Sequence, residues 1–372
     1  MIIYVDIDET ICDTPESRNY ELSSPINDRI EKINALYDKG HTIVYWTARG
    51  TGSGIDWRKT TEKQFKDWGV KYHELKLKKP IYDLFICDKA IRTEEFLKTM
   101  IRLAEKIIDD GDISSLVEWL QQSDRFTKGE QTLLFEAEWS KWLGSKYSVF
   151  VNSGSSANLL VTLALLYSGR LRNKKVIVPA ISWVTTVSPA MQLGMTPILC
   201  DSDKDDLGLD VEHFERLCEE HKPALAILVH VLGHANKMKQ ILEICKKHDV
   251  LLVEDTCEAY GSQHLGQKLG TFGIASTHSF FYGHAMSTIE GGMVSTDDYD
   301  LFNLMLSLRS HGWLRDNDQL YRQKILNRYD MNEPFLENYF FVYPGLNIRN
   351  TDLNAFIGLG QMKKVDDYVN KS

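Results

Sequence analysis

The first hundred residues alternate short apolar runs with amphipathic stretches. A β-branched run at residues 1–5 precedes a stretch of helical periodicity at residues 24–40, and a second apolar run, "HTIVYW", comes next. A third apolar run, "YDLFIC", begins at residue 82. Strands separated by a helix are typical of βαβ units, because parallel strands need a crossover connection. The pattern predicts a small, parallel, Rossmann-like α/β sheet.

A second and longer α/β region follows. Residues 90–122 are helical in pattern and then polar, and residues 109–123 are predicted to be a linker. From residue 124 the chain alternates helix-like runs with strand-like runs such as "KKVIVPA" and "HDVLLVED". This alternation predicts a mixed, mainly parallel sheet wrapped by helices. The predicted domains are residues 1–108 and residues 124–372.

Composition favours a protein that acts on small molecules. The 372 residues are 43% hydrophobic and 26% charged, with a formal net charge of −9, which argues against general binding of nucleic acid or anionic membranes. No apolar run approaches the roughly 18 residues of a membrane span, and "MIIYVDIDET" has carboxylates where a signal peptide has an apolar core. We therefore expect a cytoplasmic protein. Six cysteines without a CxxC pair predict reduced thiols rather than a cysteine-bound metal or cluster.

Polar side chains end the predicted strands of the first domain. Asp6 and Asp8 follow the first strand, Thr47 ends the second, and Lys79 and Asp88 flank the third. The carboxyl ends of parallel strands share one edge of a sheet, which is where α/β proteins bind ligands. The ordered segments "DIDET", "YWTARG", "KKP" and "DLFICDKA" resemble the haloacid dehalogenase-like phosphatases over roughly residues 1–108, with little room for a cap domain.

This resemblance implies a magnesium-dependent phosphatase site. Asp6 would be the nucleophile and Asp8 the general acid/base, while Thr47 and Lys79 would hold the phosphate. The implied magnesium ligands are Asp6, Asp8 and Asp88. A carboxylate attacks a phosphoryl group only where Mg²⁺ and a cation neutralise the repulsion. This chain has Cys87-Asp88 at the last of these motifs, where relatives usually carry two adjacent acidic residues. The alternative is that the aspartates merely cap loops and helix starts.

Three turns of the second domain carry candidate chemistry. In "NSGSSANLL", Gly154, Ser155 and Ser156 stand where a strand gives way to a helix, so they can hold a phosphate or simply form an N-cap. Trp183 follows a strand end and can stack on a flat ring or belong to the core. Asp255 ends the apolar run "LLVED", where it can pair with a protonated pyridine nitrogen.

From about residue 124 to the end, the chain resembles the sugar aminotransferase family of fold-type I pyridoxal-phosphate enzymes, which act on nucleotide-linked keto sugars. The resemblance rests on "FTKGE", "SGSSAN", "EDTCEAYGS", "STIEGGM", "LRSHGW" and "NIRNTDLNAFIGLGQ". It implies that Asp255 pairs with the cofactor ring nitrogen, Trp183 stacks on the ring and Glu258 lies beside it. Asn347 resembles the residue that reaches the phosphate of the neighbouring subunit, so a homodimer is implied. The residues implied at the phosphate of the same subunit are Gly154, Ser155, Ser156 and Ser279.

His284 stands where those aminotransferases have their Schiff-base lysine. That lysine lies six residues before the Glu of "EGG", which is Glu290 here, and no lysine occurs between Lys268 and Lys324. An imidazole cannot form the covalent link, so the cofactor would be held non-covalently, in its pyridoxamine form. The exchange resembles the 3-dehydratase branch of the family. It implies 3-dehydration of a nucleotide-linked 4-keto-6-deoxy hexose, with His284 as base and glutamate as amino donor.

Several functions are consistent with the sequence. The leading hypothesis is a bifunctional enzyme of deoxysugar synthesis, with phosphatase and dehydratase domains. A nucleotide-sugar aminotransferase would need a lysine that the sequence does not offer. A non-catalytic module for cofactor or nucleotide sugar is favoured by Ala285, where close relatives often have a second histidine. His284 would then be an ordinary buried, hydrogen-bonded histidine. Family members continue beyond "GLGQMKKVDDY" into a smaller domain, so we expect either that this domain is truncated here or that another chain completes the site.

Overall fold

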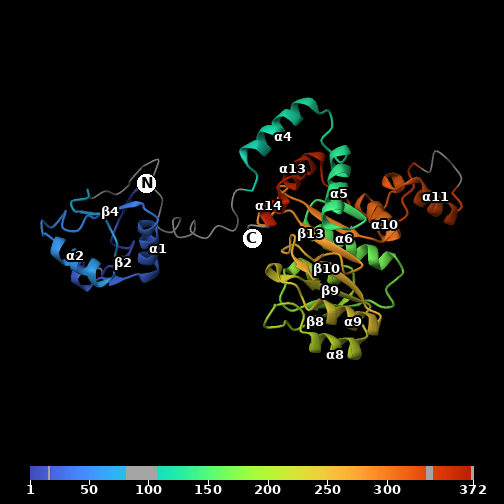
Figure 1. Ribbon diagram of the computed structural model, residues 1–372, viewed down its shortest axis with the longest axis horizontal. Helices are drawn as coiled ribbons and strands as arrows, with labels where there is room; N and C mark the ends of the chain where they lie inside the picture. The colour runs from blue at the N-terminus through green and yellow to red at the C-terminus, as the bar shows by residue number, and fades with distance from the viewer. Residues whose placement is uncertain (16, 81–106, 332–337, 370–372) are drawn as a thin grey trace. The chain divides into compact units, whose positions relative to one another are not determined.

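The protein is described by a computed structural model that covers residues 1–15, 17–80, 107–331 and 338–369. The chain divides into two compact units, Met1–Leu103 and Ala104–Ser372, drawn in Figure 1. Each unit has its own sheet and its own hydrophobic core. The expected third strand of the first unit and the expected magnesium ligand Asp88 lie outside the described residues.

The first unit is built on a parallel sheet with the order β1-β4-β5 among its described residues. β1 (Ile2–Val5) and β4 (Thr42–Trp46) are the two strands expected there, and α1 (Asn27–Asp38) is the helix expected between them. β5 (Glu74–Lys76) is too short and too polar to show in the hydrophobic pattern. The other described elements of this unit are α2 (Arg58–Asp67), the 3-10 helix η1 (Tyr20–Leu22), β2 (Cys12–Asp13) and β3 (Ser24–Pro25).

The second unit contains a seven-stranded sheet with the order β6-β14-β13-β10-β9-β7-β8. All strands run parallel except β14, which lies antiparallel to β13 and β6. β9 reads "LAILV" and is buried at every position, as expected for a strand covered on both faces. The predicted mixed, mainly parallel sheet is confirmed. The strands are β6 (Tyr147–Val151), β7 (Lys175–Pro179), β8 (Thr196–Cys200), β9 (Leu225–Val229), β10 (Leu251–Asp255), β13 (Ala275–Ser279) and β14 (Gly292–Thr296), with a separate hairpin of β11 (Gln263–His264) and β12 (Gln267–Lys268).

Helices cover both faces of this sheet, so the unit has three layers (Figure 1). Leu225 and Ile227 of β9 pack in the core beneath α6 and α10, whereas Ala226 and Leu228 pack beneath α8 and α9. Alternate side chains of a strand point to opposite faces, which separates the two cores. No described helix is both long and apolar enough to cross a membrane. The helices are α4 (Asp110–Gln122), α5 (Glu130–Leu143), α6 (Gly154–Tyr167), α7 (Val184–Gln192), α8 (Val211–His221), α9 (Met238–His248), α10 (Tyr299–Arg309), α11 (Gln319–Arg328), α13 (Asp352–Met362) and α14 (Val365–Val369), with the 3-10 helices η2 (Val231–Gly233) and η3 (Leu314–Asp316).

The segment expected to be a linker, residues 109–123, is mostly helical. Helix α4 begins with a capping box in which Asp109 and Asp112 each accept a hydrogen bond from the other's backbone N–H. Trp119 of α4 stacks on a phenylalanine of α13, with 4.9 Å between ring centroids. Isolated helices of this length are marginal in water, so packing on α13 stabilises α4. The expectation failed because that partner lies more than two hundred residues further along the chain.

A buried carboxylate, Asp352, holds the start of α5. Asp352 is 4% exposed and accepts hydrogen bonds from the backbone N–H groups of Gly129, Gln131 and Thr132 at 2.7, 3.2 and 3.0 Å, and from the Thr132 hydroxyl at 2.6 Å. The first N–H groups of a helix lack partners within it, and a negative charge is favourable there. A Cβ on Gly129 would lie 2.7 Å from this carboxylate, so the contact requires the glycine of "FTKGE".

We expect Asp352→Ala to lower the free energy of unfolding of the second unit by about 2–4 kcal/mol. The substitution removes four hydrogen bonds to a charged group and leaves N–H groups buried without partners. Urea denaturation followed by tryptophan fluorescence measures the change. The control is Asp367→Ala, which removes an exposed carboxylate of α14 and should alter stability by less than about 0.5 kcal/mol. Equal unfolding midpoints for the two variants would contradict the role of Asp352.

Candidate active site

The carboxyl ends of β6, β10 and β13 and the start of α6 meet at one edge of the large sheet. Two glycines permit the approach. A Cβ on Gly154 would lie 2.5 Å from Cβ of Ser279, and a Cβ on Gly292 would lie 2.2 Å from the carbonyl oxygen of Ser153. Real Cβ atoms do not come so close to their neighbours. The glycines of "SGSS" and "EGG" therefore bring β13 and β14 against the N-terminus of α6.

The N-terminus of α6 suits a phosphate. Ser153 caps the helix by accepting a hydrogen bond from Ser156 N–H at 3.1 Å. Ser155 is exposed, and its hydroxyl lies 3.2 Å from that of Thr185. Unpaired N–H groups at a helix start, together with nearby hydroxyls, attract anions. The predicted phosphate-binding residues that meet at this point are Gly154, Ser155, Ser156 and Ser279.

Asp255 ends β10 as a buried carboxylate with a fixed orientation. It is 4% exposed, and its Oδ2 accepts hydrogen bonds from Asn158 Nδ2 and Thr186 Oγ1, each at 2.9 Å. Its Oδ1 accepts one from the N–H of Cys257 at 3.2 Å. Thr277 orients Asn158 in turn, because its hydroxyl donates to Asn158 Oδ1 at 2.7 Å. Partners of this kind are what allow a buried carboxylate to stay charged and to pair with a protonated ring nitrogen.

The sequence interpretation did not select Asn158 and Thr186, although each has a signal. Asn158 lies four residues after Gly154, so the two share one face of α6. Thr186 lies three residues after Trp183, in the first turn of α7. Both side chains are at most 3% exposed, and a buried polar group needs a partner. That the shared partner is Asp255 is visible only in the folded chain.

His284 lies in the turn after β13, close to two carboxylates. Burial lowers the pKa of its imidazole, and the negative charges of Glu258 and Asp255 oppose that shift. The ring lies near those of Tyr260 and Phe281, with 6.4 Å between centroids in each case. Among the described residues none forms a hydrogen bond with its ring nitrogens. A lowered pKa favours the neutral imidazole, which is the form that can accept a proton.

The turn that contains His284 is held by the segment "NTDLN". Asn354 Nδ2 donates to the carbonyl of Thr288 at 2.7 Å, and Asn350 Nδ2 donates to the carbonyl of Glu290 at 3.0 Å. Between these carbonyls Ile289 has φ of +71°, a conformation that costs a β-branched residue on the order of 1–3 kcal/mol. The two asparagines maintain this strained backbone and so fix the turn.

Three further predicted residues are exposed around this site. Trp183 is the N-cap residue of α7 and is 75% exposed, so its ring is open for stacking and does not belong to the core. Glu258 accepts a hydrogen bond from the N–H of Leu232 at 2.7 Å. Asn347 forms a backbone bridge with Ser310. Its role in a neighbouring subunit stays a prediction.

The chemistry of these groups fits a pyridoxal-type cofactor. The N-terminus of α6 can hold the phosphate, Asp255 can pair with the ring nitrogen and Trp183 can stack on the ring. No lysine occurs between residues 268 and 324, and the imidazole on the turn after β13 that feels the charge of Asp255 is His284.

In the first unit the two aspartates are bound by different cations. Asp6 Oδ2 lies 2.5 Å from Lys79 Nζ, and the N–H of Lys79 donates to the carbonyl of Thr47 at 3.0 Å. The structure thus brings Asp6, Thr47 and Lys79 together. Asp8 forms an ion pair with the buried Arg49, whose Nε and Nη2 lie 3.0 and 2.8 Å from Asp8 Oδ1. The structure thus places Asp8 against a guanidinium, whereas Asp6 lies against an ammonium.

Known proteins resemble the second unit in both sequence and fold. The model of the DegT/DnrJ/EryC1/StrS aminotransferase family matches residues 108–372. GDP-4-keto-6-deoxy-D-mannose 3-dehydratase of Yersinia pseudotuberculosis is 35% identical over 273 residues, which cover 72% of this chain and 67% of the relative. A crystal structure of a mutant GDP-4-keto-6-deoxymannose-3-dehydratase with bound GDP-perosamine superposes with a TM-score of 0.65 at 33% identity, covering 72% of this chain and 69% of that one. A structure of the same type of dehydratase with a trapped PLP-glutamate geminal diamine gives 0.64 at 33% identity, covering 71% and 68%.

These similarities agree with the geometry of the second unit. The chain spans about two thirds of the length of these relatives. The family match begins at residue 108, so it does not bear on the acidic site of the first unit, and a magnesium-dependent phosphatase there stays a prediction. The matched segment includes α4 and every element of the candidate cofactor site. The chain belongs to the DegT/DnrJ/EryC1/StrS aminotransferase family.

Proposed function

We propose that the second unit is a pyridoxal-phosphate-dependent sugar 3-dehydratase. Its substrate is a nucleotide-linked 4-keto-6-deoxy hexose of the GDP-4-keto-6-deoxymannose type, and glutamate is the amino donor. The observation that carries the proposal is the position of His284, whose imidazole lies within the electrostatic influence of Asp255 and Glu258 in a segment without lysine. The ligands of the relatives, GDP-perosamine and a PLP-glutamate adduct, support the choice of substrate class, cofactor and donor.

When bound, the cofactor in its amine form supplies an electron sink. Asp255, oriented by Asn158 and Thr186, keeps the ring nitrogen protonated, and the N-terminus of α6 holds the phosphate. His284 would remove a proton from the cofactor carbon that bears the amine. It would then donate a proton to the C3 hydroxyl of the sugar, which leaves as water. Because His284 cannot displace the product by a covalent link of its own, water completes the release of a 3-deoxy ketone and ammonia.

The exposed apolar side chains near the site support a homodimer. Exposed apolar patches on proteins commonly mark interaction surfaces. A second copy would cover this surface and would place its own Asn347 near the phosphate, which is the arrangement that the family resemblance implies. The apolar residues concerned are Ile181, Trp183, Val184 and Ile289, which are 50%, 75%, 65% and 49% exposed.

Replacing the base tests the proposed reaction. We expect His284→Asn to lose dehydration by about 10²–10⁴-fold, the usual contribution of a positioned acid or base, while cofactor binding measured by equilibrium dialysis is retained. The assay is mass spectrometry of products formed from PLP, glutamate and GDP-4-keto-6-deoxymannose. Wild-type protein should release ammonia and a sugar lighter by one oxygen.

The other outcomes of this assay separate the alternatives. An amino sugar formed by the wild type would indicate an aminotransferase. Cofactor binding without any product would indicate a binding module. The control is His221→Asn at the end of α8, which should match the wild type, and unchanged turnover of the His284 variant would refute its role as base.

The pH dependence of the reaction follows from the environment of His284. Burial holds the pKa of His284 below its usual value of about 6.5, so the acidic limb of kcat/KM should have its midpoint below about pH 6.5. Glu258 raises this pKa through its negative charge. Glu258→Gln should therefore move the limb to lower pH, since the charged imidazole loses a favourable neighbour. A shift to higher pH would contradict the assigned arrangement.

A phosphatase activity of the first unit is favoured by the contact of Asp6 with Lys79 next to Thr47. We expect Asp6→Asn to reduce the Mg²⁺-dependent hydrolysis of p-nitrophenyl phosphate by more than about 10³-fold, as is usual on removal of a nucleophile. Asp28→Asn, which neutralises an exposed carboxylate of the same unit, should retain activity. Absence of hydrolysis by the wild type, or equal rates for the two variants, would exclude Asp6 as the nucleophile of such a reaction.

A further inference from the structure

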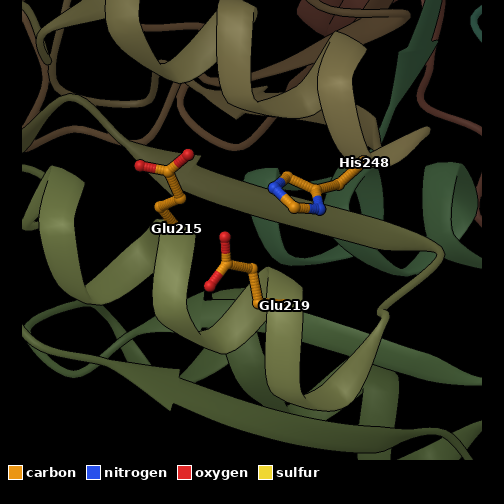
Figure 2. Close-up of side chains that lie close together, drawn as sticks. All are labelled: Glu215, Glu219 and His248. Carbon is orange, nitrogen blue, oxygen red and sulfur yellow. The ribbon is translucent and has the colours of Figure 1, made fainter.

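Two glutamates and a histidine converge on neighbouring helices outside the cofactor site (Figure 2). Glu215 and Glu219 are one turn apart on the same face of α8, and His248 is the last residue of α9. One potential ligand atom of each residue lies within 4.8 Å of the others. Helices α8 and α9 share one hydrophobic core, so the three side chains extend from a rigid base.

The imidazole of His248 has an unsatisfied nitrogen on this side. Its Nε2 is buried from solvent and has no hydrogen-bond partner among the described residues. Figure 2 shows the edge of the ring that carries Nε2 turned toward both carboxylates. A buried polar atom without a partner is unfavourable unless another group binds it. The free lone pair of a neutral imidazole is the form that binds a metal ion.

A cation already occupies the space between the carboxylates. Lys247 Nζ lies 2.8 Å from Glu215 and 3.6 Å from Glu219. The Lys247 side chain is 56% exposed, and exposed ion pairs of this kind contribute little to stability. Glu215 and Glu219 carry like charges one turn apart and repel each other, so a cation between them is favourable. The exposed ion pair with Lys247 is weak enough for another cation to replace it.

We propose that Glu215, Glu219 and His248 form a zinc site that links α8 to α9, with Zn²⁺ replacing the ammonium of Lys247. One imidazole nitrogen and two carboxylates are a ligand set that Zn²⁺ accepts, and water completes the tetrahedron. Ligand atoms around tetrahedral Zn²⁺ lie roughly 3.4 Å apart, because the metal–ligand bonds are about 2.0–2.2 Å long. Small side-chain rotations therefore close the present cluster around the ion. The imidazole favours zinc over magnesium or calcium, which prefer ligands that are all oxygen.

Nearby thiols do not compete for the ion. Cys218 and Cys245 are buried between the same helices. Burial raises the pKa of each thiol to about 12, and the thiolate is the form that binds metals. The site therefore depends on the two glutamates and the histidine.

Competition between the full-length protein and a chromophoric zinc chelator tests this proposal. We expect His248→Ala and Glu219→Gln to weaken the binding of one Zn²⁺ per chain by at least about tenfold, since loss of a group that merely orients a ligand already weakens binding by about 10- to 100-fold. The control is His221→Ala. It removes the imidazole of the last residue of α8, which lies beside Glu220 and is not one of the three proposed ligands. Its affinity should equal that of the wild type.

A fourth variant has the opposite expected effect. Lys247→Met removes the competing ammonium and should tighten Zn²⁺ binding, whereas a site elsewhere would not respond. Saturating Zn²⁺ should also raise the Tm of the wild type but not that of His248→Ala, because only a ligand of the folded state stabilises it. Equal affinity of His248→Ala and His221→Ala, or weaker binding by Lys247→Met, would overturn the proposal.

Discussion

The candidate cofactor site depends on the buried carboxylate of Asp255. A charge at the end of a central strand is tolerated only when it is hydrogen-bonded. Its partners are Asn158, in the second turn of α6, and Thr186, in the first turn of α7. These two contacts fix where both helices begin relative to β10. The predicted phosphate-binding turn at the start of α6 and Trp183 at the start of α7 are positioned by the same contacts, so one carboxylate orients three parts of the candidate site.

The C-terminal segment "NTDLN" supplies a second constraint. Asp352 holds the start of α5 through four hydrogen bonds. Asn350 and Asn354 hold the carbonyls that flank Ile289. The strained backbone at Ile289 is tolerable because these amides over-determine it. One short segment thus links the start of α5 to the loop that contains His284.

The exchange of a lysine for His284 alters chemistry without altering this scaffold. An imidazole can move protons but forms no lasting bond to a carbonyl, so a cofactor bound beside His284 in the proposed way would be held by non-covalent contacts. Fixed hydrogen bonds to Asp255 and a prepared helix N-terminus meet that requirement. The acidic site of the first unit differs, because Asp8 is bound by the buried Arg49 while Asp6 faces Lys79.

Much of the fold could be predicted from the sequence because it depends on local patterns. Apolar runs such as "LAILV" determine buried strands, their alternation with helices determines the mainly parallel sheet, and residues at strand ends determine which side chains reach its edge. The exchange of lysine for His284 is likewise visible in the sequence alone. Only the tertiary structure showed that residues 110–122 form a packed helix, that Asn158 and Thr186 orient Asp255, and that Arg49 binds Asp8. Each of these depends on a partner distant in the chain, and periodicity reports the burial of a side chain but not the group against which it is buried.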